Sequence, residues 1–253
     1  MSSLPIVQLQ KIANNRSPMS LEILAYEETP LGLLCLRRRE LLSNPGVMVT
    51  EVTLNHEFLM SSYLTQSERA LSYFGLDRCS ALNEDQKLNT MVGGLGLGYT
   101  AFELLKSDTV GRVEVVEFLP EVIGWTKDGL IPLSEQLNSD SRLAITHGDV
   151  YARLGTEGKG DFDLIVIDVD HSPEDVLGDQ SNKFYSESGL EIAKTHLLPG
   201  GVIGIWSYAE SSPLLQSMKK VFDDVSVEKV TVFNDLIQEE QTDWLFFGRR
   251  NLQ

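Results

Sequence analysis

The chain of 253 residues is 42% hydrophobic and carries a formal net charge of −16 at pH 7. This length suits one large domain, or a domain with a smaller appendage, and is sufficient to bury a core. The excess of negative charge opposes binding to nucleic acid or to an anionic membrane, and it favours cationic partners.

The cysteine content and the ends of the chain narrow the class of protein further. Cys35 and Cys79 are too few for a disulfide framework and lack the spacing of a metal site, so we expect two buried thiols and no metal. We find no secretory signal, targeting tail or apolar run of membrane-spanning length. These features predict a cytoplasmic protein without a membrane partner.

The first part of the chain predicts a small antiparallel sheet. After a polar start, short strand-like runs cover residues 21–26, 32–36, 46–54 and 57–61. Turn-forming residues separate these runs, at Thr29-Pro30, Asn44-Pro45-Gly46 and Asn55-His56. We therefore expect a small N-terminal β-domain over residues 1–62, followed by a second domain over residues 63–253.

A helix is predicted next, over residues 65–74, with Thr65 or Ser67 as its N-cap and Gly75 as its stop. Residues 88–117 then predict a strand, a glycine turn, a helix and a second strand. The turn contains Gly94, Gly96 and Gly98, which allow a tight bend and the close approach of a ligand to the N–H groups that open the helix. The second strand ends at Glu117, which is placed to accept hydrogen bonds from two ribose hydroxyls.

The spacing of this turn distinguishes it from two common nucleotide-binding motifs. The dinucleotide fingerprint G-x-G-x-x-G/A requires a small residue at position 99, where this chain has Tyr99. A P-loop is excluded because no G-x-x-x-x-G-K-[ST] is present. The pattern G-x-G-x-G, with an acid at the end of the next strand, is more typical of folds that bind S-adenosylmethionine.

Strands alternate with helices along the rest of the chain, which predicts a parallel sheet covered on both faces. Strands are expected at residues 113–116, 142–146, 162–167 and 202–206, and helices at residues 120–129, 184–196 and 213–221. Residues 227–233 and 244–248 predict a closing hairpin.

The polar residues that follow successive strands are expected to converge in one crevice, because ligands of open α/β sheets lie beyond the carboxyl ends of the strands. These residues are the glycine turn, Glu117, Asp149, the segment 168–173 and the segment 206–208. Each alone has a simpler explanation, such as a helix cap or a solvated loop. Their joint placement predicts a nucleoside site.

From about residue 21 to residue 249, these motifs resemble those of spermidine synthases and their spermidine-synthase-like relatives among class I S-adenosylmethionine-dependent methyltransferases. The family turn G-G-G-D-G-G is similar to residues 94–99, and its acid after strand two is similar to Glu117. Three later segments are also similar to segments of the family: FDLIVID at residues 162–168, KFY at 183–185 and LLPGGV at 197–202. The resemblance implies a Rossmann-like, seven-stranded α/β sheet with a small N-terminal antiparallel β-domain.

The resemblance also implies a set of binding residues. Glu117 corresponds to the ribose-binding acid, Asp149 and Val150 to the adenine site, and Gly94, Gly96, Gly98 and Asp168 to the remaining wall of the donor site. The donor implied is S-adenosylmethionine or its decarboxylated form, used without a metal. Trp206 and Tyr208, just after the fifth strand, are candidates for the acceptor pocket. The family further implies a homodimer, for which the N-terminal sheet is the candidate interface.

Two departures from the family pattern affect the expected reaction. The family acid that helps to hold the aminopropyl arm falls on Leu97, and the family loop D-[ST]-[ST]-D-P is similar to residues 168–173, DVDHSP. Its catalytic aspartate therefore corresponds to His171 or, with a slip of one residue, to Asp170. Together with Asp168, these are our candidate catalytic residues, because an amine acceptor must lose a proton before attack.

Three functions follow from these features. The first is an aminopropyltransferase-like enzyme that acts on a cationic amine, and the acidic loop after Asp168 favours it. The second is a methyltransferase that uses S-adenosylmethionine itself. The D-V-D motif at residues 168–170 and Leu97 favour it. The third is a nucleoside-binding protein without catalysis.

Overall fold

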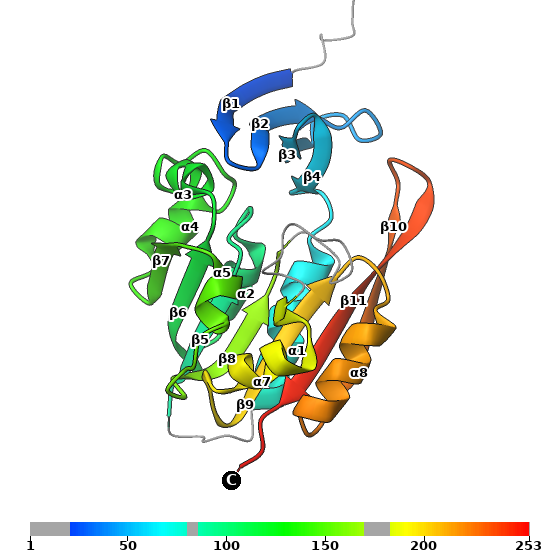
Figure 1. Ribbon diagram of the computed structural model, residues 1–253. Helices are drawn as coiled ribbons and strands as arrows, with labels where there is room; N and C mark the ends of the chain where they lie inside the picture. Colours follow the sequence, from blue (N-terminus) through cyan, green and yellow to red (C-terminus); the bar gives the residue numbers. More distant parts are fainter. Residues whose placement is uncertain (1–20, 80–85, 170–182, 253) are drawn as a thin grey trace, which may run out of the picture.

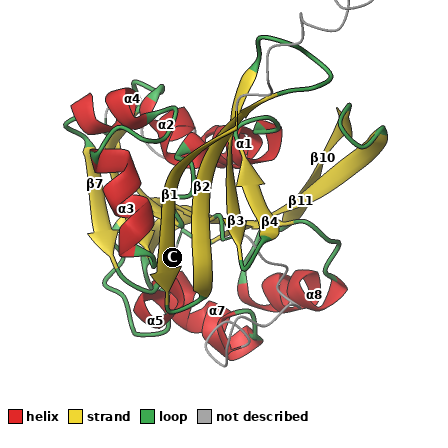
Figure 2. Ribbon diagram, turned by 90° about the horizontal axis from the view of Figure 1, so that it is seen from above, coloured by secondary structure: helices red, strands yellow, loops and turns green. Residues whose placement is uncertain are grey.

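The computed structural model describes residues 21–79, 86–169 and 183–252, which form two β-sheets with helices around the larger one (Figure 1). The smaller sheet is antiparallel with the strand order β1-β2-β3-β4, and the larger has seven strands in the order β10-β11-β9-β8-β5-β6-β7. This arrangement confirms the predicted α/β fold with a small N-terminal antiparallel sheet. Seen from above, the smaller sheet lies in front of the larger one, and the β10–β11 hairpin extends to one side (Figure 2).

The N-terminal sheet forms where the alternating runs predicted it. Its strands are β1 (Leu21–Thr29), β2 (Gly32–Glu40), β3 (Met48–Leu54) and β4 (Glu57–Ser61). Asn55 and His56 join β3 to β4 with positive φ values of 52° and 70°. Positive φ at both central residues is the conformation that a two-residue hairpin requires, and asparagine tolerates it well.

The large sheet is parallel in its centre and antiparallel at one edge. Its strands are β5 (Leu88–Gly93), β6 (Val110–Glu117), β7 (Leu143–His147), β8 (Phe162–Ile167), β9 (Leu197–Ser207), β10 (Ser226–Asn234) and β11 (Glu239–Arg249). The pairs β5–β6, β6–β7, β5–β8 and β8–β9 are parallel, whereas β11 runs antiparallel to β9 and β10. The carboxyl ends of the parallel strands therefore meet at one edge.

Helices cover both faces of this sheet and create two hydrophobic cores. They are α1 (Gln66–Cys79), α2 (Tyr99–Leu105), α3 (Pro120–Lys127), α4 (Ser134–Ser139), α5 (Val150–Leu154), α7 (Glu187–Lys194) and α8 (Ser212–Val221). Successive residues of β8 alternate between the cores: Leu164 packs with α1 and α2 on one face, and Ile165 packs with α5, α7 and α8 on the other. Leu34 and Leu36 of the N-terminal sheet join the first core, so that sheet is packed against the first face.

Two sequence-based boundaries are wrong. Gly75, expected to end the first helix, lies inside α1, where the side chain of Leu164 occupies the space beside it. A Cβ at position 75 would lie 2.9 Å from Leu164 Cδ1, so this glycine allows close packing of helix on sheet. The strand expected at residues 202–206 begins earlier, because β9 already starts at Leu197.

The division of the chain at residues 62 and 63 stays a prediction, because the two sheets share a core. Among the helices that the structure describes, none combines the length and the apolarity required to cross a membrane.

Helix α1 should depend on its buried face. Leu71 is 0% exposed and Tyr73, on the same helix, is 63% exposed. We expect Leu71→Ala to lower the free energy of unfolding by about 2–5 kcal/mol, because it leaves a cavity against β8 and β9, and Tyr73→Ala to change it by less than about 0.5 kcal/mol. Urea unfolding of the two variants measures both values, and equal losses would contradict this packing.

Candidate functional site

The glycine turn has the backbone geometry that its sequence predicts. Gly94, Gly96 and Gly98 have positive φ values of 93°, 50° and 85°. A Cβ at position 94 would lie 2.2 Å from the backbone oxygen of Asp168, and one at position 98 would lie 2.5 Å from Leu137 Cδ1. These positions therefore require glycine for both conformation and space, and they bring the turn into contact with the end of β8.

Glu117 holds this turn from the end of β6. Its side chain accepts hydrogen bonds from the N–H of Leu95 at 2.7 Å and from the N–H of Leu119 at 2.8 Å. Burial is the largest influence and raises the pKa of Glu117, although backbone N–H donors such as Leu119 and Leu95 oppose the shift. The residue is only 7% exposed. Backbone N–H groups of Gly96 and Phe118 also act on this carboxylate. The ribose role stays a prediction beside this structural one.

Asp149 caps helix α5, which was the simpler interpretation of this residue. Its Oδ1 accepts hydrogen bonds from the N–H of Tyr151 at 2.8 Å and of Ala152 at 3.2 Å. Val150, the next residue, is buried against Gly93 in the second core. The cap leaves Oδ2 of Asp149 for a ligand, so the predicted adenine contact is compatible with the structure and untested by it.

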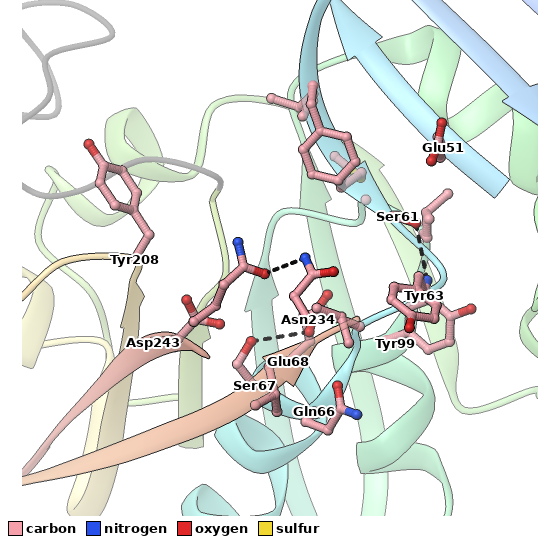
Figure 3. A pocket seen from close by; sticks show the side chains of 18 of the residues that line it. Glu51, Ser61, Tyr63, Gln66, Ser67, Glu68, Tyr99, Tyr208, Asn234 and Asp243 are labelled. Carbon is pink, nitrogen blue, oxygen red and sulfur yellow. Dashed lines mark hydrogen bonds between the residues drawn. The ribbon is translucent and has the colours of Figure 1, made fainter. Parts of the chain in front are cut away.

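A cavity of about 1000 Å³ opens beside the turn, between the N-terminal sheet, α1 and the β10–β11 hairpin (Figure 3). Gly96, Gly98 and Asp168 line it, as do Trp206 and Tyr208, whereas Glu117 and Asp149 are not among its lining residues. One wall is apolar and contains Leu54, Leu59, Met60, Leu95 and Leu97. Leu97 is thus in the lining at the position where the family has an acid.

The cavity lining also contains three carboxylates from distant parts of the chain: Glu68 of α1, Asp168 after β8 and Asp243 of β11. Ser67 donates a hydrogen bond to Glu68 at 3.3 Å, and Thr100 of α2 donates one to Asp168 Oδ2. Figure 3 shows Ser67, Glu68 and Asp243 on the same side of the cavity. Below, we call Glu68, Asp168 and Asp243 the acidic wall.

Burial and mutual repulsion change the acidity of this wall. Burial, followed by the charge of Asp168, raises the pKa of Glu68 from its ordinary 4.5 to about 8. Burial likewise raises the pKa of Asp168 from 3.8 to about 6, against the hydrogen bond from Thr100 and with a further contribution from the charge of Asp243. The pKa of Asp243 is also raised by burial, while Ser67 and Trp206 beside it act in the opposite direction. The wall therefore favours a proton or a bound cation.

Sequence reasoning missed Glu68 and Asp243. Glu68 lies in the first turn of a helix, where an acid is common because it interacts favourably with the helix dipole. Asp243 lies within a strand that was predicted only as a closing hairpin. Its position directly before the apolar run of residues 244–247 is the signal that could have identified it.

The other two predicted catalytic residues, Asp170 and His171, lie outside the described residues, as do Ser172 and Pro173. Within the described part of the chain, no group of three or more histidines, cysteines or acids is arranged to hold a metal ion.

Comparison with known proteins supports the resemblance. The chain is 30% identical over 144 residues to a polyamine aminopropyltransferase of Prochlorococcus marinus, a match that covers 54% of this chain and 49% of the relative. It is 29% identical over 113 residues to a putrescine N-methyltransferase of Nicotiana tabacum, covering 45% and 28% of the two chains. The first match thus spans about half the length of that relative. No protein-family model matches the sequence.

Solved structures show the same fold. A spermidine synthase in complex with the transition state analogue AdoDATO superposes with a TM-score of 0.71 at 16% identity, covering 92% of this chain and 75% of the other. The spermidine synthase of Thermotoga maritima gives 0.67 at 14% identity, with coverages of 92% and 73%. Human methyltransferase-like protein 13 in complex with SAH gives 0.56 at 20% identity, with coverages of 73% and 82%. The predicted resemblance to the spermidine-synthase-like group, and the methyltransferase-type fold, are confirmed.

The raised pKa of Glu68 predicts how the stability of the protein depends on pH. Between pH 4.5 and about 8, the folded protein retains a proton on Glu68 that the unfolded chain releases, so the free energy of unfolding should fall as pH rises through this window. Glu68→Gln removes the titrating group. We expect this variant to be more stable than the original chain at pH 8 and to lose its advantage near pH 4.5.

Thermal or urea unfolding at several pH values measures this difference. Glu103→Gln serves as the opposite control: although burial acts to raise the pKa of Glu103, hydrogen bonds and charges of Lys106 and Arg69 lower it overall. That variant should be less stable than the original chain above the ordinary pKa of glutamate and should recover as pH falls below it. An advantage of Glu68→Gln that does not change with pH would contradict the assignment.

Proposed function

We propose that this chain is a transferase that binds a sulfonium nucleoside of the S-adenosylmethionine type at the glycine turn and transfers its aminopropyl group to a cationic amine. The observation that carries the proposal is the acidic wall beside that turn. Three carboxylates that share one cavity repel one another, and an ammonium group relieves the repulsion. The relatives, a polyamine aminopropyltransferase and a putrescine N-methyltransferase, support an amine as the acceptor.

The reaction requires positioning and a proton acceptor. An amine with a pKa of about 10 is protonated at neutral pH, so it must lose a proton before its lone pair can attack. The nitrogen then bonds to the carbon attached to the sulfonium, the carbon–sulfur bond breaks, and its electron pair converts the sulfonium into a neutral thioether. The protein must hold nitrogen, carbon and sulfur in line and exclude water.

Asp168 is the described residue best placed to take the proton. Its pKa of about 6 leaves it ionised at neutral pH and more basic than an ordinary aspartate. It lines the cavity, and the Gly94 backbone lies directly against it. Glu68 and Asp243 surround the same space and supply further negative charge for the remaining ammonium groups of the acceptor. Asp170 and His171 are retained as alternative bases from the sequence.

Methyl transfer from S-adenosylmethionine is the second candidate. Leu97 favours it, because an apolar side chain cannot pair with the ammonium that ends an aminopropyl arm, and Leu97 is 4% exposed in the cavity lining. The relative named putrescine N-methyltransferase favours it as well. No observation favours a protein without catalysis.

A cytoplasmic homodimer completes the proposal. The dimer is inferred from the resemblance, and the exposed apolar side chains of Leu21, Ile23 and Tyr26 on β1 are compatible with it. The net charge of −16 argues against nucleic acid as a partner.

Product analysis tests the proposed reaction. The protein is incubated with putrescine and either S-adenosylmethionine or its decarboxylated form, and mass spectrometry identifies a methylated or an aminopropylated product. We expect Asp168→Asn to lower kcat by about two to four powers of ten, and Glu135→Gln, an exposed control, to leave it unchanged. Asp170→Ala and His171→Ala show whether the sequence-predicted bases contribute. No product with either donor would contradict transfer to this acceptor.

The adenine contact has a separate test that preserves the cap of α5. Asp149→Ser keeps a hydroxyl that caps the helix but removes the carboxylate. We expect it to weaken binding of methylthioadenosine by about 1–3 kcal/mol while the free energy of unfolding stays within about 0.5 kcal/mol. Calorimetric titration measures the first quantity and urea unfolding the second. Unchanged binding would limit Asp149 to its role as a cap.

A further inference from the structure

Two arginines supply the positive charge among the described residues that line the cavity. Arg37 and Arg39, both on β2, are the cationic residues among the described residues that line it, whereas the other charged ones are Glu51, Glu57 and the acidic wall. In a chain with a net charge of −16, a pair of arginines directed into an acidic cavity is an unexpected feature. It requires an explanation in terms of either packing or a ligand.

Glu51 on β3 fixes the two guanidinium groups side by side. Arg37 donates to Oε2 of Glu51 through Nε at 3.0 Å and Nη2 at 2.8 Å, and Arg39 donates to Oε1 through Nε at 2.8 Å and Nη2 at 2.6 Å. Glu51 is 3% exposed. Although burial acts to raise its pKa, the hydrogen bonds and charges of Arg39 and Arg37 lower the pKa of Glu51 overall. Glu51 therefore stays ionised, and the group of three carries a net charge of about +1.

The arginines still have donors to offer. Glu51 occupies the edge of each guanidinium that is formed by Nε and Nη2. The edge formed by Nη1 and Nη2 is left to bind another ligand. This free edge has two parallel N–H groups and matches a carboxylate. The side chains of Arg37 and Arg39 are 35% and 28% exposed, so both remain accessible from the cavity.

A purely structural ion pair explains this arrangement less well. A buried carboxylate between two arginines gains little stability over apolar residues of similar size, because desolvation offsets the attraction. Arg38, the residue between them, projects from the opposite face of β2 and is not part of the cavity lining. Glu51 thus holds the two guanidinium groups next to each other on the cavity side of β2.

We propose that the free edges of Arg37 and Arg39 form a binding site for a carboxylate group inside this cavity. With the acidic wall for an ammonium group, the cavity is then complementary to a ligand that carries both charges. Figure 3 shows Glu51 on the N-terminal sheet, away from Ser67, Glu68 and Asp243. The carboxylate and the ammonium group of such a ligand would therefore lie at different ends of the molecule.

Two sources of this carboxylate are compatible with the proposed function, on which this inference rests. One is the donor, since S-adenosylmethionine carries a carboxylate that its decarboxylated form lacks. The other is the acceptor, as an amine that also carries a carboxylate. The donor source would favour methyl transfer, and the acceptor source would define an amino acid as substrate.

Two ligand pairs that differ by one carboxylate test the site. They are S-adenosylmethionine with its decarboxylated form, and ornithine with putrescine. Calorimetric titration gives the dissociation constants for the original chain, for Arg37→Gln/Arg39→Gln and for the control Arg38→Gln. We expect the carboxylated member of one pair to bind about 10 to 100 times more weakly to the double variant, with its decarboxylated partner and the control variant unaffected. The pair that responds identifies the source.

Loss of both arginines leaves Glu51 buried without a partner, so that variant risks misfolding. The triple variant Arg37→Met/Glu51→Met/Arg39→Met removes the charges together and is expected to fold. If the carboxylated member of each pair binds the original chain and the triple variant equally, or binds neither, the inference is wrong. Binding of methylthioadenosine to all variants, measured in parallel, tests the nucleoside site alone, and its absence in the original chain would contradict the proposed function instead.

Discussion

The repulsion between three carboxylates in one cavity is the constraint on which the rest of the site depends. Glu68, Asp168 and Asp243 come from α1, from the end of β8 and from β11, so no short segment of the chain creates the acidic wall. Raised pKa values of about 8 for Glu68 and about 6 for Asp168 are the consequence of burying these groups together. Such a wall is stable when it holds protons or cations, and this requirement links the fold to an amine substrate.

The fold brings the wall to the glycine turn through a few close contacts. Gly94 leaves no room for a side chain beside the backbone oxygen of Asp168, and Thr100, in the helix after the turn, donates a hydrogen bond to the Asp168 carboxylate. Glu117 holds the turn itself through the N–H of Leu95. A donor bound at the turn and an amine bound at the acidic wall are therefore neighbours, which is the arrangement that an in-line displacement requires.

Much of the architecture follows from sequence periodicity and turn chemistry. Alternating strands and helices predicted the large sheet, short strands separated by turn residues predicted the small one, and Gly94, Gly96 and Gly98 adopt the left-handed conformation expected of them. Gly75 was misinterpreted because the side chain that requires its small size, Leu164, is far away in sequence. Glu68, Asp243, Arg37 and Arg39 were missed for the same reason: each gains its role from partners that only the tertiary fold supplies. Local patterns predict elements and turns, whereas the charge distribution of a cavity assembled from several elements is visible only in the structure.

The most direct test of the central claim is the number of protons released when an amine binds. Calorimetric titration with putrescine at pH 7, repeated in buffers of different ionisation enthalpy, measures this number. Because Glu68 holds a proton at this pH and an ammonium group displaces it, the account predicts net release of protons into the buffer, and a clear reduction of that release in Glu68→Gln. Binding without proton release, or equal release by the variant, would contradict the assignment of the acidic wall as the amine site.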